Sequence, residues 1–437
     1  MDLVVTETLF VQLRSYLRES RGSVMPLVAL TLPVLMSLSG LGVDASSWLM
    51  AQRNLQTAAD AAAMAGAWEA GRGFQDKVNY SAEKEAVNNG FVDGQGSIAI
   101  EFSEGNGSSV TGDNVEVVLR QDVPVFFLRL LGRESITVEA AATAAVTRVS
   151  DEFCILSLDR SQDGALKTSG TVDLMMPDCG IAVNSASDRG MIVNGNVEIT
   201  VQDVHLSGEY VITGNSAELT YEDLVVGAPP ILDPYEDLEV PAFAACTSAS
   251  IKKPLKITSS TTLNPGVYCG GISASGNNTI TLNPGTYIMA GGSFDVSGGG
   301  SLVGNGVTII LTNGGGSSGT TSTTYGQFNI TGNRSISLTA STSGTYEGIA
   351  VFQDRRAPSN TAQGNFLTGG STVVVDGLMY FPNQELNYGG SVATSTSGHC
   401  TRMIANTVIM HGTPFIGNDC EGRNERPIGN PVIRLVG

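Results

Sequence analysis

The C-terminal half of the chain repeats a short motif, first as Asn264-Pro-Gly-Val-Tyr-Cys-Gly-Gly271 and, 19 positions further on, as Asn283-Pro-Gly-Thr-Tyr-Ile-Met-Ala-Gly-Gly292. In the same stretch, Ser-Gly turns at Gly276 and Gly298 stand 22 positions apart. A period of about 20 residues, with strands and turns but little helix, is typical of short coils stacked into a solenoid.

The same region contains many strand–turn–strand elements with Gly-Asn or Gly-Gly at the turn. They occupy residues 192–199, 211–215, 272–277, 294–298, 328–333 and 386–390. Gly and Asn suit corners that need positive φ, and the apolar residues of each strand then point inward onto the next coil. We therefore predict a mainly β fold in which residues 151–437 form a right-handed parallel β-helix. A β-sandwich of hairpins is the alternative, because Gly-Asn also makes hairpin turns.

Two segments interrupt the repeat. Residues 228–241 are rich in Pro and acidic side chains, and residues 313–324 contain little besides Gly, Ser and Thr. Such compositions are typical of loops, so we expect both segments to leave the solenoid.

The composition excludes several classes of protein. Charged residues make up 15 % of the 437 positions, against about 25 % in an ordinary soluble domain, and the net charge is −18. This acidic balance argues against nucleic acid as a partner, since phosphate binding needs clustered cations. With three histidines in the chain, we expect no His-based metal or catalytic centre and no cofactor.

An uncharged apolar stretch over residues 22–43 follows Arg14, Arg18 and Arg21. About 20 such residues in a helix span the roughly 30 Å hydrocarbon core of a membrane, and the arginines place the N-terminus in the cytoplasm. The Ala-rich residues 45–70 should continue this helix and dock against the rest of the chain or against a partner membrane protein. A cleaved signal peptide and a buried core helix are the other interpretations of the apolar stretch.

The predicted order of parts is therefore simple. A cytoplasmic tail (1–21) precedes a transmembrane helix with its Ala-rich extension (22–71). A small α+β module (72–150) comes next, and the repeat domain (151–437) ends the chain.

Two strings in the N-terminal part are similar to a known family. Gly40-Leu-Gly-Val-Asp44, followed by Leu55-Gln-Thr-Ala-Ala-Asp-Ala-Ala-Ala63, resembles the start of Tad (tight adherence) pilus-assembly proteins. The similarity is to the TadE/TadG-like module of Flp-type pilus systems, and Asp44, Gln56 and Asp60 are the motif residues. Residues 348–358 and 377–383 resemble the body of large TadG-type members.

The resemblance implies a non-enzymatic accessory protein with a single pass through the bacterial inner membrane. Its N-terminus would be cytoplasmic and its body periplasmic or extracellular, and its partners would be other pilus-assembly membrane proteins or pilus subunits. Type IV prepilins carry a Glu five residues after the Gly that precedes their cleavage site. The fifth residue after Gly22 is Leu27, so that carboxylate is missing here.

Six cysteines all follow the apolar stretch, on the side where disulfides persist. They fall into sequential pairs 25, 23 and 20 positions apart, each close to the length of one coil. Residues one coil apart lie roughly 5 Å from each other, within the Cα range of a disulfide. We predict the pairs Cys154–Cys179, Cys246–Cys269 and Cys400–Cys420. A zinc site is the rival interpretation, although no Cys-x2-Cys spacing is present.

No arrangement of residues in the sequence indicates an active site. Asp354-Arg355-Arg356 is the densest charged cluster of the repeat region, and we expect a salt-bridged loop there rather than a site for a polyanion. His205, His399 and His411 have no visible partner for catalysis. A structural role in pilus assembly is the favoured function, and a membrane-tethered adhesin or carbohydrate-active β-helix is the alternative.

Overall fold

The computed structural model describes residues 24–92, 94–103, 113–147, 153–214, 216–247, 253–313, 325–368, 370, 373–390, 398–413, 416–417, 419–420, 426 and 428–436. The expected cytoplasmic tail and nearly all of the Gly/Ser/Thr loop at 313–324 lie outside the described residues. The chain divides into two compact units. We call them the helical unit (Met1–Arg148 with Pro431–Gly437) and the parallel unit (Val149–Asn430).

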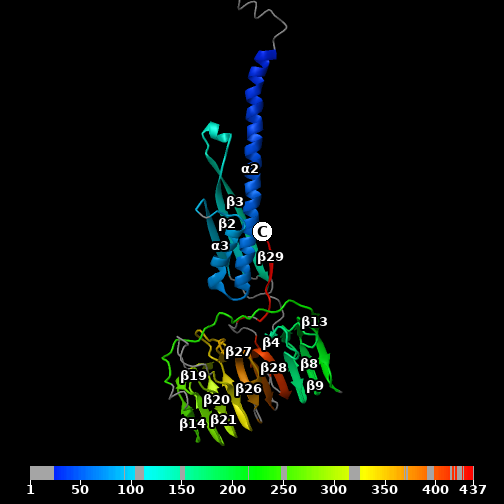
Figure 1. The fold of residues 1–437 in the computed structure, drawn as a ribbon, viewed down its shortest axis with the longest axis vertical. Coiled ribbons are helices and arrows are strands. Elements are labelled where there is room, and N and C mark those ends of the chain that lie inside the picture. The colour runs from blue at the N-terminus through cyan, green and yellow to red at the C-terminus, as the bar shows by residue number, and fades with distance from the viewer. Residues whose placement is uncertain are drawn as a thin grey trace, which may run out of the picture. The chain divides into compact units, whose positions relative to one another are not determined.

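The helical unit packs helices on a small antiparallel sheet (Figure 1). Its elements are α2 (Val24–Gly71), η1 (Gln75–Lys77), α3 (Val78–Asn88), β1 (Gly96–Ser103), β2 (Asn114–Pro124), η2 (Leu128–Leu131), β3 (Ser135–Thr147) and β29 (Val432–Leu435). The strand order is β1-β2-β3-β29. The prediction that the repeat domain extends to residue 437 is wrong for its last residues, because Val432 pairs with Thr147 on β3. The chain thus leaves this unit after β3 and returns to cover its sheet edge.

Helix α2 has two halves with different surroundings. Every side chain from Val24 to Ser39 is exposed, whereas Ala58, Ala59, Ala62, Ala63 and Ala67 are fully buried. These alanines pack against the sheet and α3 in one apolar cluster with Val115 and Ala142. The Ala-rich extension therefore docks within its own chain. Among the described residues, α2 is the one helix long and apolar enough to cross a membrane.

In the parallel unit, strands stack in parallel ladders. The first ladder runs β16 (Gly266–Cys269), β19 (Gly285–Ala290), β22 (Val307–Thr312), β25 (Ile349–Gln353), β27 (Val373–Gly390), β28 (Thr401–Gly412), β4 (Phe153–Ser157), β7 (Gly180–Val183), β10 (Asp203–Leu206) and β13 (Asp223–Val226). The second runs β14 (Leu255–Ile257), β17 (Ile272–Ala274), β20 (Phe294–Val296), β23 (Phe328–Ile330), β26 (Asn360–Thr368), β27, β28, β5 (Leu166–Ser169), β8 (Met191–Val193) and β11 (Tyr210–Ile212).

A third set of strands also pairs in parallel. It consists of β15 (Thr261–Leu263), β18 (Asn278–Leu282), β21 (Gly300–Asn305), β24 (Arg334–Thr339) and the start of β27, with a separate sheet of β6 (Thr171–Met176), β9 (Asn196–Val201) and β12 (Glu218–Thr220). Every pairing between the named strands of this unit is parallel, which rules out the sandwich of hairpins for them.

The sequence period reappears as the register of the ladders. Thr261 lies opposite Ile280, which is the 19-residue offset, and Asn278 lies opposite Gly300, which is the 22-residue offset. The side chains of Asn264 and Asn283 stack, with Asn283 Nδ2 donating to Asn264 Oδ1 at 2.8 Å. Gly276 and Gly298 both have φ of +92°, so these stacked corners use the left-handed conformation that favours glycine.

The coils do not stack in the order of the sequence. The chain enters at β4 and stacks outward to β13, and then residues 227–254 carry it to β14 at the opposite end (Figure 1). From β14 it stacks back, coil upon coil, until β28 pairs with β4. The first and last strands of the parallel unit, β4 and β28, are therefore neighbours. In chain order the whole unit is inserted between β3 and β29.

The segment 227–254, which we call the strap, corrects one prediction. Its Pro-rich acidic part leaves the repeat as a loop, as predicted, but it is not the solvated excursion that we expect from its composition, because its described residues pack on the outer side of the first ladder. Asn184 exchanges two 2.8 Å hydrogen bonds with the backbone of Ile231, and Ile231 and Tyr235 are buried. The strap covers an apolar surface, and strands such as β22 and β4 are therefore buried on both faces.

Candidate functional site

Asp44 holds the connection between β2 and β3 against helix α2. Its Oδ1 accepts a hydrogen bond from Phe126 N at 2.9 Å, and its Oδ2 accepts from Phe127 N at 2.8 Å and Leu128 N at 2.7 Å. These amides stand at the start of η2, where a helical turn leaves its N–H groups without partners. A carboxylate is the acceptor that binds such a set most strongly. Asp44 is 3 % exposed, so its carboxylate is buried against these three amides and interacts with them rather than with solvent.

Gly40 lies one helical turn before Asp44 on the same face of α2. A Cβ added to Gly40 would lie 2.4 Å from Cδ1 of the Phe127 ring. The ring therefore sits directly on the helix backbone, and any larger residue at position 40 would displace it. Gly40 and Asp44 together fix the tip of the β2–β3 connection at one height along α2.

Gln56 and Asp60 make a second link between α2 and the sheet. Gln56 Nε2 donates to Asp60 Oδ1 at 2.8 Å and to the carbonyl oxygen of Ala141 on β3 at 2.9 Å. The two side chains are four positions apart and share one face of the helix. Asp44 therefore binds the β2–β3 connection, whereas Gln56 binds the backbone of β3 and the neighbouring Asp60.

We expect Asp44→Ala to release the β2–β3 connection from α2, because three backbone N–H groups lose their acceptor together. Hydrogen–deuterium exchange at the amides of residues 126–128 should become faster. Asp44→Asn keeps one acceptor oxygen and should give a smaller increase. Asp76→Ala on exposed η1 is the matched control, with unchanged exchange expected. Equal exchange in wild type and Asp44→Ala would contradict this role.

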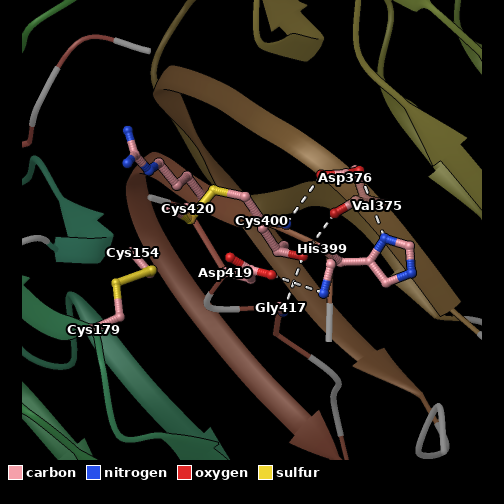
Figure 2. Close-up of a disulfide and its surroundings, with 12 residues drawn as sticks. Cys154, Cys179, Val375, Asp376, His399, Cys400, Gly417, Asp419 and Cys420 are labelled. Carbon is pink, nitrogen blue, oxygen red and sulfur yellow. Dashed lines mark hydrogen bonds and ion pairs between the residues drawn. A yellow bond between two sulfur atoms is a disulfide. The ribbon is translucent and has the colours of Figure 1, made fainter. Parts of the chain in front are cut away.

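The disulfides of the parallel unit are the three sequential pairs that the spacing predicts. Their Cα atoms are 5.8 Å apart in Cys154–Cys179, 5.7 Å in Cys246–Cys269 and 4.7 Å in Cys400–Cys420. The first joins the turn after β6 to β4, and the second ties the end of the strap to β16. The third joins the start of β28 to the segment that follows it, as Figure 2 shows.

His399 has a carboxylate neighbour that was not predicted from the sequence. Its Nδ1 lies 3.6 Å from Asp376 Oδ2, and Asp376 Oδ1 also accepts a hydrogen bond from Cys400 N at 3.0 Å (Figure 2). The nearby Thr401 hydroxyl donates to the carbonyl oxygen of Val375 at 2.7 Å. The pair therefore lies within a network of backbone contacts around the Cys400–Cys420 bond. Residues 376 and 399 are 23 positions apart, and Gly377 lies opposite Thr401 in the ladder, so the coil-length spacing that predicts the cysteine pairs also brings Asp376 and His399 together.

The charged cluster Asp354-Arg355-Arg356 contacts the strap through Arg355. Arg355 pairs with Asp233 of the strap and with the Tyr380 hydroxyl, while Arg356 Nη2 lies 2.8 Å from Asp354 Oδ2. Burial alone would lower the pKa of Arg355, but the facing Asp233 carboxylate and Tyr380 outweigh it and raise that pKa.

A cavity of about 420 Å³ adjoins this cluster, between the strap and β25. Glu236, Glu239 and Phe243 of the strap line it together with Phe352 and the three charged residues. The guanidinium groups beside it already have carboxylate partners. The contacts fit a salt-bridged connection between strap and ladder.

Comparison with known proteins agrees with the geometry of the helical unit. Helix α2 carries Asp44 against the β2–β3 connection, and Gln56 and Asp60 beside β3. Residues 22–69 match the Tad family model, described as putative Flp pilus-assembly TadE/G-like.

The match confirms the resemblance predicted from Gly40–Asp44 and Leu55–Ala63, and it is limited to residues 22–69. Residues 70–437 lie outside the match, so the resemblance drawn for 348–358 and 377–383 stays a prediction. No curated protein and no solved structure matches the chain.

Proposed function

We propose that this protein is a non-enzymatic, membrane-anchored accessory of Flp pilus assembly. The observation that carries the proposal is the coincidence of two features on one helix. The Tad module occupies residues 22–69, and within it the apolar residues Val24–Ser39 are exposed while the alanines beyond are buried against the chain's own sheet. An apolar half-helix without protein around it fits a lipid-facing anchor.

In this proposal the N-terminus is cytoplasmic and both units lie on the other face of the bacterial inner membrane. The arginines before the apolar stretch support the orientation. Three disulfides in the parallel unit also support it, because such bonds persist in the periplasm and outside the cell but are rare in the cytoplasm.

The rigid body of the protein would be a right-handed parallel β-helix. The parallel ladders, the third set of parallel strands and the recurring offsets support this architecture, and parallel crossover connections are right-handed in nearly all known cases. A body of this kind presents Ser/Thr-rich faces to pilus subunits or to other assembly proteins. In this proposal the body binds partners and catalyses no reaction.

Deleting the gene in the native bacterium tests the proposal. Surface pili, counted by electron microscopy, should be lost and should return with a plasmid copy. Normal piliation together with lost adhesion or lost polysaccharide cleavage would overturn the proposal in favour of the tethered adhesin or carbohydrate-active protein.

A further inference from the structure

The connection between β2 and β3 ends in an exposed tip, which we define as residues 126–129 with Gly132 and Arg133. Phe126 is 68 % exposed and Phe127 is 42 % exposed. Arg129 and Arg133 are exposed as well. An exposed cluster of aromatic and cationic side chains is unusual for a surface that faces only water.

The tip is fixed at a definite height on the anchor helix. Asp44 binds the three amides of residues 126–128, and the Phe127 ring rests on Gly40. From Val24 to Asp44 the helix rises by about 30 Å at 1.5 Å per residue, which is the thickness of the hydrocarbon core. The tip thus lies beside α2 at the level where the apolar stretch ends, and the exposed half of α2 extends beyond it (Figure 1).

The side chains at this level have the composition of a membrane interface. Trp48 is 41 % exposed one turn beyond Asp44, and aromatic rings are enriched at the headgroup level of membrane proteins. Arginine heads bind lipid phosphates while their stems remain in apolar surroundings. Phe126, Phe127, Trp48, Arg129 and Arg133 are therefore exposed aromatic and cationic side chains near the end of the span.

We propose that the tip inserts into the headgroup region of the same bilayer that α2 crosses, with phospholipid as its partner. The inference rests on the proposed anchoring by α2. A second contact with lipid beside the helix fixes the rotation and tilt of the helical unit relative to the membrane, which one helix alone would leave free. The family motif residue Asp44 then acts as a positioning residue for membrane contact.

Labelling of single introduced thiols tests the proposal, because the described cysteines are all in disulfides. Full-length chain carrying a fluorophore at Phe126→Cys would be reconstituted into phosphatidylcholine–phosphatidylglycerol vesicles with or without bromine on the lipid chains. Asp44 binds the backbone amide of residue 126, so this substitution retains that contact. Leu32→Cys, within the apolar stretch, and Tyr80→Cys, on α3, are the reference sites, and both side chains are exposed.

We expect brominated lipid to quench the labels at positions 126 and 32 and to leave the label at position 80 unquenched. Quenching at 32 with none at 126 would overturn the insertion of the tip while leaving the anchor intact. Absence of quenching at 32 and 126 alike would overturn the anchor and the inference together.

Discussion

Replacing Arg334 by methionine is expected to lower the free energy of unfolding of the parallel unit by about 3 kcal/mol. Arg334 is fully buried at the start of β24. Its Nη1 donates to the carbonyl oxygens of Asn278 and Ser301 at 2.7 and 3.0 Å. Its Nη2 donates to Gly276 O and Asn278 Oδ1 at 3.0 Å and to Ser297 O at 3.3 Å.

The guanidinium thus binds backbone carbonyls of the corner turns in two earlier coils. Methionine has a similar stem but no donor, so several buried oxygens would lose their partners, each at a cost of about 1–3 kcal/mol before water relaxes into the site. Arg334→Lys should be intermediate, since an ammonium group does not match the planar fork of donors.

Urea unfolding of the full chain in detergent measures this effect. Both tryptophans, Trp48 and Trp68, lie in the helical unit, so tyrosine fluorescence should follow the parallel unit. Arg189→Met, at an exposed position of the same unit, is the control and should change stability by less than about 0.5 kcal/mol. Equal midpoints for Arg334→Met and Arg189→Met would contradict the role given to Arg334.

Removing the Cys154–Cys179 bond by a double substitution to alanine is expected to destabilise the parallel unit by about 3 kcal/mol. The bond closes a segment with a sequence separation of 25, and closure restricts the unfolded chain far more than the folded one. Both cysteines are buried in the interior, so alanine leaves no unpaired polar atom there.

The same unfolding measurement under reducing conditions provides the check. Wild type should lose stability on reduction, and the double alanine variant should lose less because one bond is already absent. If oxidised wild type and oxidised variant unfold at the same urea concentration, the bond does not stabilise the unit as described.

The register of the parallel unit was predictable because local repeats encode it. Asn264 and Asn283 occupy the same place in successive coils, and their offset is the length of a coil. The family motif was also recognisable from the residues Leu55–Ala63 around Asp60. Mainly apolar runs such as Val307–Thr312 also indicate strands that are buried on both faces.

The order of the coils was not predictable in the same way. No repeat links Met403 of β28 to Ile155 of β4, although they lie opposite each other, because their neighbourhood depends on the path of the strap. The contacts of Asp44 were hidden for a different reason. Its partners are the backbone amides of residues 126–128. Nearly every residue type has such an amide, so the sequence there does not indicate the contact.

The most direct test of membrane-anchored pilus assembly compares two complementing genes in the deletion strain. One encodes the full chain, and the other encodes residues 40–437 behind a cleavable signal peptide, which keeps Gly40 and Asp44 but removes most of the apolar stretch. We predict that electron microscopy finds surface pili only with the full chain. Pili restored equally by the unanchored chain would contradict the account.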